Sequence, residues 1–287
     1  MKKGLILEGG AMRGMFTCGV LDVFMENQVI PDGAVGVSAG ASFGCNIKSR
    51  QHGRALRYNL KYARDWRFSS TLSLVLTGDL YGAKFDYEIL PNELDVWDAD
   101  TFAKNPMEFY CVATNVKNGK ALYHKCSDGG ERDLKWIRGS ASMPLVSRPV
   151  KVDGFELLDG GISDSIPLTF FENIGYDRNV LILTQPKDYE KKPFDKKMQF
   201  LLKTSLEKKS PALYEALEHR YQKYNETLAL IKDKEEKGEI FVIRPEAPLN
   251  IGSVCHDPDE KQRVYDEGRK AAYEALKKVK TFYQDEK

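Results

Sequence analysis

The chain has 287 residues, of which 42% are hydrophobic and 30% are charged, and its formal net charge is +1. These proportions are typical of a globular protein, and a nearly neutral chain has no overall electrostatic attraction to nucleic acid, so no nucleic-acid partner is expected. No run of apolar residues approaches the roughly 18 that a membrane-spanning helix needs.

The first predicted element is a strand over residues 3–7, which leads directly into the glycine-rich segment Glu8-Gly9-Gly10-Ala11-Met12-Arg13-Gly14. An amphipathic helix is predicted over residues 15–27. A glycine-rich loop between a strand and a helix presents bare backbone N–H groups near the positive end of the helix. That arrangement suits an anion, either a phosphate or the oxyanion of an acyl-transfer intermediate.

The second predicted strand ends in the pentapeptide Gly36-Val37-Ser38-Ala39-Gly40, and a helix is expected to begin near residue 41. G-x-S-x-G is the spacing of a nucleophile elbow, a sharp strand-to-helix turn that exposes a serine hydroxyl. The flanking glycines let the turn close without a Cβ clash. The pentapeptide alone also fits an ordinary turn with a passive serine. The glycine loop just upstream favours the nucleophile.

Strands and helices alternate through the rest of the chain. The sequence predicts helices over 54–65, 133–142, 194–209, 211–237 and 258–283, strands over 108–114, 120–124, 179–184 and 239–243, and a strand pair or hairpin over 150–158. The region from 66 to about 97 is mixed, and its aromatic part up to residue 81 is typical of either core or an acyl pocket. This alternation predicts an α/β fold, a three-layer α/β/α domain with a mainly parallel sheet. We expect one domain over residues 1–287.

Asp159 is the second candidate catalytic residue. It follows the apolar run Phe155–Leu158 and precedes Gly160-Gly161, so it is expected at a strand end followed by a turn. By itself an Asp-Gly pair is most often a plain turn. In a chain with an elbow, which needs a base to activate its serine, Asp159 becomes the candidate for that base.

Taken together, E-G-G-A-M-R-G, G-V-S-A-G and D-G-G resemble, in order and rough spacing, the three signatures of the patatin-like phospholipases, a family of lipid acyl hydrolases. The resemblance covers about residues 4–185, with residues 190–287 as a helical extension. It implies a patatin-like fold and a serine–aspartate dyad. Ser38 would attack the ester carbonyl of a phospholipid or lysophospholipid, and Asp159 would accept the hydroxyl proton, through an acyl-enzyme.

The same resemblance assigns the oxyanion hole to the N–H groups of Gly9, Gly10 and Ala11, with the positive charge of Arg13 nearby. The family's loop usually reads D-G-G-G-x-R-G, so this chain departs from it at Glu8 and Ala11. Because main-chain groups bind the oxyanion, Ala11 is expected to cost little if its backbone conformation is permitted. The role of Glu8 stays open.

Two alternatives remain at this stage, besides a catalytically idle scaffold. A Ser-Asp-His triad with His219 or His256 would follow the chain order of α/β-hydrolases. However, the elbow comes after one earlier strand only, no H-G-G-G segment precedes it, and the two histidines lie in a charged helical run and in a loop. The other alternative is a phosphate- or nucleotide-binding protein that uses the loop as an anion cradle, although neither GK[ST] nor G-x-G-x-x-G is present.

No cofactor and no metal are expected, because a hydroxyl, a carboxylate and main-chain donors suffice for acyl transfer. Five dispersed cysteines without C-x-x-C spacing favour reduced thiols and a cytoplasmic protein. The N-terminus opens like a signal peptide, but Glu8 interrupts its apolar stretch. Residues 186–209 carry eight lysines against four carboxylates with apolar side chains between them. That pattern favours a solvated face, and peripheral contact with anionic lipid stays open as the alternative. The expected partner is a lipid or ester substrate.

Overall fold

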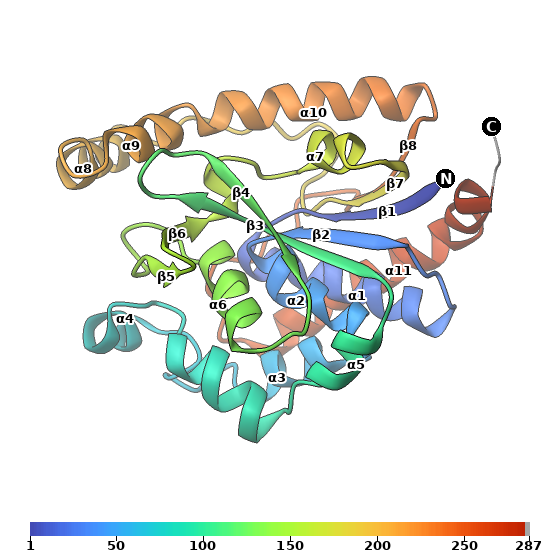
Figure 1. The fold of residues 1–287 in the computed structure, drawn as a ribbon, viewed down its shortest axis with the longest axis horizontal. Coiled ribbons are helices and arrows are strands. Elements are labelled where there is room, and N and C mark those ends of the chain that lie inside the picture. The colour runs from blue at the N-terminus through green and yellow to red at the C-terminus, as the bar shows by residue number, and fades with distance from the viewer. Residues whose placement is uncertain (285–287) are drawn as a thin grey trace.

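The computed structural model describes residues 1–284, and a mixed eight-stranded sheet forms its centre (Figure 1). The strand order is β5-β6-β3-β2-β1-β7-β8, with β4 paired to β3 outside this path. The five strands from β3 to β8 along this order are parallel, whereas β4, β5 and β6 are antiparallel to their neighbours. The strands are β1 (Lys2–Leu7), β2 (Gly33–Val37), β3 (Glu108–Asn115), β4 (Ala121–Cys126), β5 (Val150–Val152), β6 (Phe155–Asp159), β7 (Tyr176–Ile182) and β8 (Ile240–Ile243).

Helices cover both faces of the sheet, which confirms the predicted three-layer α/β/α architecture (Figure 1). In Figure 1, α7 and α10 lie above the sheet and α1, α2, α6 and α11 lie below it. The helices are α1 (Gly14–Glu26), α2 (Ala39–Lys48), α3 (Arg54–Lys61), α4 (Thr71–Thr77), α5 (Ala99–Lys104), α6 (Glu131–Ser140), α7 (Leu168–Asn173), α8 (Lys196–Leu206), α9 (Pro211–Glu218), α10 (Arg220–Glu236) and α11 (Pro258–Gln284).

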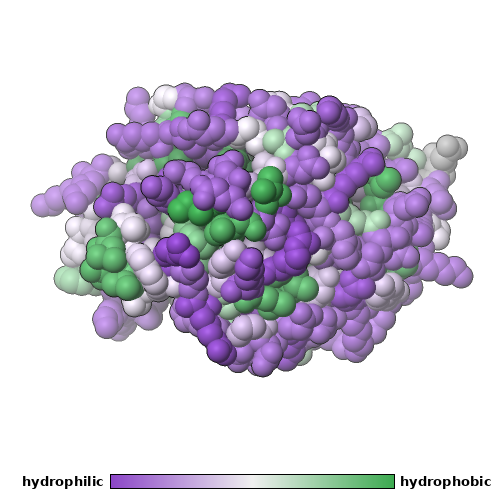
Figure 2. Space-filling model, turned by 90° about the horizontal axis from the view of Figure 1, so that it is seen from below, coloured by the Kyte–Doolittle hydropathy of each residue, from purple (hydrophilic) through white to green (hydrophobic). Residues whose placement is uncertain are grey.

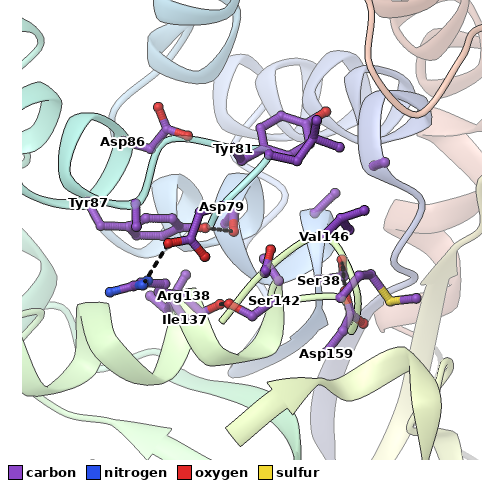
Figure 3. A pocket seen from close by; sticks show the side chains of 18 of the residues that line it. Ser38, Asp79, Tyr81, Asp86, Tyr87, Ile137, Arg138, Ser142, Val146 and Asp159 are labelled. Atoms are coloured by element: carbon purple, nitrogen blue, oxygen red, sulfur yellow. Dashed lines mark hydrogen bonds and ion pairs between the residues drawn. The ribbon is translucent and has the colours of Figure 1, made fainter. Parts of the chain in front are cut away.

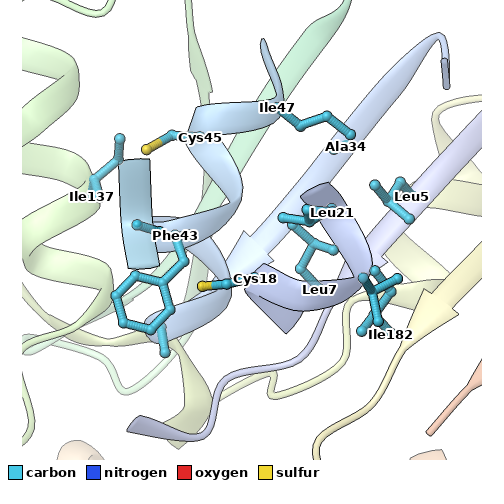
Figure 4. Packing of buried hydrophobic residues seen from close by; sticks show 14 of the residues in the cluster. Leu5, Leu7, Cys18, Leu21, Ala34, Phe43, Cys45, Ile47, Ile137 and Ile182 are labelled. Atoms are coloured by element: carbon cyan, nitrogen blue, oxygen red, sulfur yellow. The ribbon is translucent and has the colours of Figure 1, made fainter. Parts of the chain in front are cut away.

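Side chains of β1 belong to the hydrophobic clusters on both faces of the sheet. Leu5 and Leu7 pack into the hydrophobic cluster shared with α1, α2 and α11, whereas Ile6 packs into the cluster on the opposite face. Successive side chains of a strand point to opposite faces, so a continuous apolar run is what a sheet covered on both sides requires. Figure 4 shows Leu5, Leu7 and Ile182 beside Leu21 of α1.

Strands β2 and β6 pair with the same side of β3, at successive positions along its length. Pairing of β2 with β3 ends at Val37, opposite Val112, and pairing of β6 with β3 begins at Asp159, opposite Ala113. Residues 113 and 114 pair with β4 at the same time, so β4 must occupy the other edge. The end of β2 and the end of β6 therefore meet beside two consecutive residues of β3.

Some predicted boundaries were wrong. The helix expected over 211–237 is divided into α9 and α10 at His219, whose backbone (φ −92°, ψ 2°) leaves the helical region. The strand expected over 179–184 begins earlier, at Tyr176, and ends at Ile182. The mixed region contains α4 and a π-helix over Phe85–Leu94, with Pro91 inside it. Proline lacks the N–H that an α-helix would use, and a wider turn accommodates it.

Two short helices, α5 and α7, were not predicted, because six residues are too few to show a helical period. None of the helices in residues 1–284 combines the length and the hydropathy that crossing a bilayer requires.

Candidate active site

Ser38 lies in the sharp turn between β2 and α2. Its backbone has φ 55° and ψ −122°, a conformation that costs energy for any residue with a side chain. A Cβ on Gly36 would lie 2.3 Å from the carbonyl oxygen of Gly40, and a Cβ on Gly40 would lie 2.3 Å from that of Leu7. Both glycines are therefore required by close backbone approach, and the turn has the strained geometry of a nucleophile elbow.

The meeting of β2 and β6 along β3 brings Ser38 to Asp159. The Ser38 hydroxyl donates a hydrogen bond of 2.6 Å to Asp159 Oδ2, although 121 residues separate the two. The other carboxylate oxygen of Asp159 accepts the N–H of Gly161 at 2.7 Å. This second bond fixes the carboxylate so that one oxygen faces the serine, which is the arrangement that a nucleophile and its base require.

The environment of Asp159 pulls its pKa in two directions. The side chain is buried, with 2% of the residue exposed, and this burial raises the pKa of the carboxyl. The Ser38 hydroxyl, the positive charge of Arg220, the N–H of Gly161 and the charge of Lys191 act in the opposite direction. Burial dominates, so Asp159 is a stronger base than an exposed aspartate.

The glycine loop lies directly against the elbow. A Cβ on Gly9 would lie 2.9 Å from the Cβ of Ser38, and one on Gly10 would lie 2.6 Å from Thr184 Oγ1. Within residues 1–284, the N–H groups of Gly9, Gly10 and Ala11 donate to no acceptor. Donors that are left unpaired beside a nucleophile are suited to an oxyanion.

Glu8 and Ala11, the two departures from the family's loop, have different consequences. Glu8 is buried and accepts hydrogen bonds from Thr184 N (2.6 Å), Thr184 Oγ1 (3.2 Å) and Tyr224 Oη (2.5 Å). It therefore ties the loop to the end of β7 and to α10. Ala11 has φ 48°, in the left-handed region, which costs about 1–2 kcal/mol for a residue other than glycine. The condition under which Ala11 was expected to cost little is therefore not met.

The four histidines all lie within residues 1–284, and none forms a hydrogen bond or an ion pair with Ser38 or Asp159. The His219 ring is exposed and its Nδ1 lies 2.7 Å from Gln222 Oε1, and His256 Nδ1 lies 2.9 Å from the carbonyl oxygen of Ala63. His52 pairs with Glu26, and His124 pairs with Asp133. The two histidines that the triad alternative would use thus bond to other groups.

Ser38 and Asp159 border a cavity of about 440 Å³ (Figure 3). Most of its lining is apolar and comes from α2, α3, the π-helix, α6 and α8, with contributions from the 143–147 segment. In Figure 3, Ser38 and Asp159 lie at one end, and Asp86 and Tyr87 lie at the other. Of the aromatic segment in the mixed region, Phe68, Leu80 and Tyr81 line the cavity, whereas Trp66 is 44% exposed at the surface.

The polar groups of this cavity are mostly paired. Arg138 and Asp79 form an ion pair of 3.5 Å, and the hydroxyl groups of Ser42 and Tyr87 lie 3.1 Å apart. A volume of this size with an apolar wall and few polar groups is typical of a small-molecule site. Its shape and lining suit a hydrocarbon chain.

Sequence reasoning missed the residues that support the dyad. Ser140 Oγ accepts the N–H of Ser38 at 2.9 Å, and the carbonyl oxygen of Ser142 accepts the N–H of Asp159 at 2.7 Å. The end of α6 thus braces both halves of the dyad. Lys191 and Arg220 were also missed as neighbours of Asp159. None of these residues belongs to a motif or a periodic pattern, so no local signal marks them.

A group of potential metal ligands within residues 1–284 lies away from this site. His124, Cys126 and Asp133 are buried, and their ligand atoms lie within 4.8 Å of one another. However, one Asp133 oxygen is 2.7 Å from His124 Nε2 and the other accepts three backbone N–H groups. The hydrogen bonds already account for this carboxylate, and they fasten the start of α6 to β4.

Comparison with known proteins identifies relatives of the whole chain and of its parts. Residues 5–171 match the model of the family described as patatin-like phospholipase, and residues 210–284 match a domain of unknown function (DUF6363). The uncharacterized protein YjjU of Escherichia coli K12 is 31% identical over 257 residues, which are 86% of this chain and 69% of that protein.

Other matches cover a smaller part of the matched protein's own length. Lysophospholipase nte1 of Emericella nidulans is 29% identical over 180 residues, which are 61% of this chain and 11% of that protein, and the nte1 of Aspergillus niger gives the same values. The crystal structure of VipD from Legionella pneumophila covers 97% of this chain and 67% of its own at 13% identity, with a TM-score of 0.46.

Proposed function

The chain belongs to the patatin-like phospholipase family, and from this premise we propose that it is a lipid acyl hydrolase that cleaves the carboxylic esters of phospholipids or lysophospholipids. The observation that carries the proposal is the 2.6 Å hydrogen bond from the Ser38 hydroxyl to the buried Asp159 carboxylate. The name of the nte1 relatives, lysophospholipase, agrees with it.

The reaction proceeds in two halves. Ser38 Oγ attacks the ester carbonyl carbon while its proton passes to Asp159, and the oxyanion forms beside the N–H groups of Gly9, Gly10 and Ala11. The intermediate collapses to an acyl-enzyme, and the leaving alcohol takes the proton from Asp159. Asp159 then removes a proton from water, which attacks the acyl-enzyme. The fatty acid leaves, and Ser38 recovers its proton.

The apolar cavity is the site we assign to the acyl chain. It begins at Ser38, and its wall includes Phe43, Phe68 and Leu90. Each methylene removed from water contributes about 0.8 kcal/mol, so a long chain gains several kcal/mol from this wall. That contribution favours esters of long-chain acids over acetates.

Residues 186–209 are the segment we assign to contact with a membrane surface. On α8, Met198, Phe200 and Leu201 are 37%, 70% and 45% exposed, and Met198 also lines the cavity. On α4, Leu72, Val75 and Leu76 are exposed as well. Figure 2 shows a hydrophobic patch at the left of the view from below, where α4 lies in Figure 1. Apolar side chains among lysines suit an anionic lipid surface.

Labelling with a fluorophosphonate, followed by mass spectrometry of the peptides, tests the nucleophile. The expected result is one modified residue, Ser38, together with release of fatty acid from lysophosphatidylcholine by the wild type. Ser38→Ala should lose both, by several orders of magnitude for turnover. Ser42→Ala, which alters another hydroxyl of the same cavity, should still be labelled. Substantial turnover by a folded Ser38→Ala protein would sink the assignment.

A further inference from the structure

Three positively charged side chains converge on the glycine loop and the dyad from different parts of the chain. Arg13 follows the loop, and its Nη2 lies 3.3 Å from where a Cβ of Gly10 would be. Arg220, at the start of α10, donates from Nε to the carbonyl oxygen of Gly161 at 2.5 Å. Lys191 lies in the segment between β7 and α8, with its ammonium 4.1 Å from the centre of the Tyr224 ring.

No carboxylate pairs with these cations. Within residues 1–284, none of the three forms an ion pair, and Arg13 Nε is buried without a hydrogen-bond partner. The two acidic residues nearby are engaged elsewhere, since Glu8 accepts hydrogen bonds from Thr184 and Tyr224, and Asp159 accepts those of Ser38 and Gly161. All three side chains are partly buried, and charges that lose contact with water are normally paired, so the cluster is short of an anion.

Lys191 is held in this position. Its backbone N–H donates to Asn225 Oδ1 at 2.9 Å, and its carbonyl oxygen accepts from Asn225 Nδ2 at 3.0 Å. Burial, together with the positive charges of Arg220 and Arg13, lowers the pKa of the Lys191 ammonium to about 7, against the opposite effect of Glu8 and Asp159. A bound anion would reverse much of this shift by supplying the missing negative charge.

The cluster is separate from the apolar cavity. Ser38 and Asp159 border the cavity, but Arg13, Lys191 and Arg220 do not line it. The positive charges of Arg220 and Lys191 nevertheless act on Asp159, where each tends to lower the pKa of the carboxyl. The dyad therefore adjoins an apolar site for a hydrocarbon chain and, apart from it, a cationic site.

We propose that Lys191 and Arg220, together with Arg13, bind the phosphate of a phospholipid or lysophospholipid while its acyl chain occupies the cavity and its ester carbonyl lies at Ser38. This inference rests on the proposed function. It assigns the headgroup side of the substrate to the segment after β7 and to α10, outside the part of the chain that matches the phospholipase family. An arginine and a lysine are the usual ligands of a phosphate in proteins.

The test compares two substrates that differ in the phosphate alone. Lysophosphatidylcholine and the monoacylglycerol with the same acyl chain are hydrolysed by the wild type, Lys191→Gln and Lys192→Gln. Lys192 is the matched control, because its side chain is 78% exposed and pairs with Glu190. In Lys191→Gln, the ratio of kcat/KM for the phosphate-bearing substrate to that for the neutral one should fall about tenfold or more, mainly through KM. In Lys192→Gln the ratio should stay within about twofold.

Two outcomes overturn the inference while leaving the proposed function intact. In one, Lys191→Gln lowers kcat/KM for both substrates by the same factor and shifts the pH profile. That result would show that Lys191 alters the pKa of Asp159 and binds no substrate. In the other, Lys191→Gln leaves kcat/KM for both substrates at the wild-type values, so their ratio does not change. If the wild type cleaves neither ester, the proposed function fails instead, and the inference is then decided by binding alone.

The binding measurement uses an ether lysophospholipid, which has no ester to cleave, in titration calorimetry below its micelle concentration. Its affinity should fall about tenfold in Lys191→Gln and should be kept in Lys192→Gln; equal affinity in all three proteins overturns the inference. In the wild type the affinity should weaken as the pH rises through about 7, where Lys191 loses its charge.

Inorganic phosphate distinguishes a substrate site from an effector site. If the cluster binds the substrate's own phosphate, inorganic phosphate should inhibit hydrolysis of lysophosphatidylcholine competitively and leave the monoacylglycerol reaction without stimulation. If inorganic phosphate instead stimulates hydrolysis of the monoacylglycerol by the wild type, and not by Lys191→Gln, the anion is a free effector and the assignment to the substrate is wrong.

Discussion

Ser38 and Asp159 show how much the chemistry of a side chain depends on its neighbours. A serine hydroxyl is a weak nucleophile unless a base removes its proton. Asp159 can be that base because burial raises its pKa, while the hydroxyl it contacts and two nearby cations favour its charged form. The net effect is a raised pKa, so the Asp159 carboxylate is more basic than that of an exposed aspartate.

Asp159→Asn tests the base. The amide cannot take the serine proton, so kcat should fall by about 10⁴-fold, approaching the loss in Ser38→Ala, because the two residues act as one unit. His219→Ala and His256→Ala are the controls and should stay near wild type. In the wild type, kcat/KM should decline on acidification with a midpoint above the usual aspartate pKa of about 3.9, since the base acts only when ionised. A folded but inactive histidine variant would favour a triad.

Ala11→Gly should stabilise the protein. Ala11 has φ 48°, which glycine adopts freely, although glycine also makes the unfolded chain more flexible. The free energy of unfolding should rise by about 0.5–1 kcal/mol, measured by chemical denaturation, with turnover maintained. Ala275→Gly, inside the regular helix α11, should lower it by about 1 kcal/mol. A loss of stability in Ala11→Gly would mean that the Ala11 methyl group packs better than its backbone strain costs.

The glycine loop and α8 are the two elements that we propose to link the dyad to its substrate. The loop presents unpaired N–H groups because it joins a parallel strand to a helix and packs on the elbow without side chains between them. α8 carries lysines and exposed apolar residues next to the cavity. One element is rigid and held by Glu8, whereas the other faces solvent.

Gly10→Val should misplace the donors of the loop. A Cβ there would lie 2.6 Å from Thr184 Oγ1, so the backbone of the loop must shift. Loss of an oxyanion donor typically lowers turnover by about 10²–10³-fold. Fluorophosphonate labelling and kcat for a short-chain ester measure the effect, and circular dichroism checks the fold. Normal ester hydrolysis by Gly10→Val would place the oxyanion hole elsewhere.

Phe200→Ser should separate membrane binding from chemistry. Phe200 is 70% exposed, so its loss removes apolar contact with lipid and little packing. Binding to vesicles that contain anionic lipid should weaken about tenfold, with a parallel loss of vesicle hydrolysis. Ile30→Ser changes a residue that is 59% exposed and lies outside the cavity lining, and it should have no such effect. Unchanged vesicle binding by Phe200→Ser would remove α8 from the membrane contact.

In the whole molecule, the site lies at the carboxyl ends of the central strands β1 and β2. The loop after β1 and the elbow after β2 follow neighbouring parallel strands, and the carboxyl ends of such strands meet at the same edge. Asp159 arrives from an antiparallel strand that continues the line of β2 along β3. The site is thus formed by residues of the sheet, of α6 and of the C-terminal helices together.

Hydrolysis of a short-chain ester in solution should survive treatment with EDTA. The proposed mechanism uses only a hydroxyl, a carboxylate and main-chain donors, and the carboxylate of the His124, Cys126 and Asp133 group is occupied by hydrogen bonds. A soluble ester removes effects of divalent ions on lipid packing from the measurement. Activity that EDTA abolishes and an added divalent ion restores would show that the dyad account is incomplete.

The alternating strands and helices and the three motifs could be predicted from the sequence, because each depends on local spacing or on the geometry of a single turn. The catalytic roles of Ser38, Asp159 and the loop stay predictions, as does the single-domain boundary. The folded structure was needed to show that Asp159 bonds Ser38, that Glu8 bonds Thr184 and Tyr224, and that Lys191 and Arg220 lie beside the dyad. These contacts join residues more than 25 positions apart, and nothing in local sequence specifies which strand edge or helix end will meet another. The packing of the sheet and its helices specifies it.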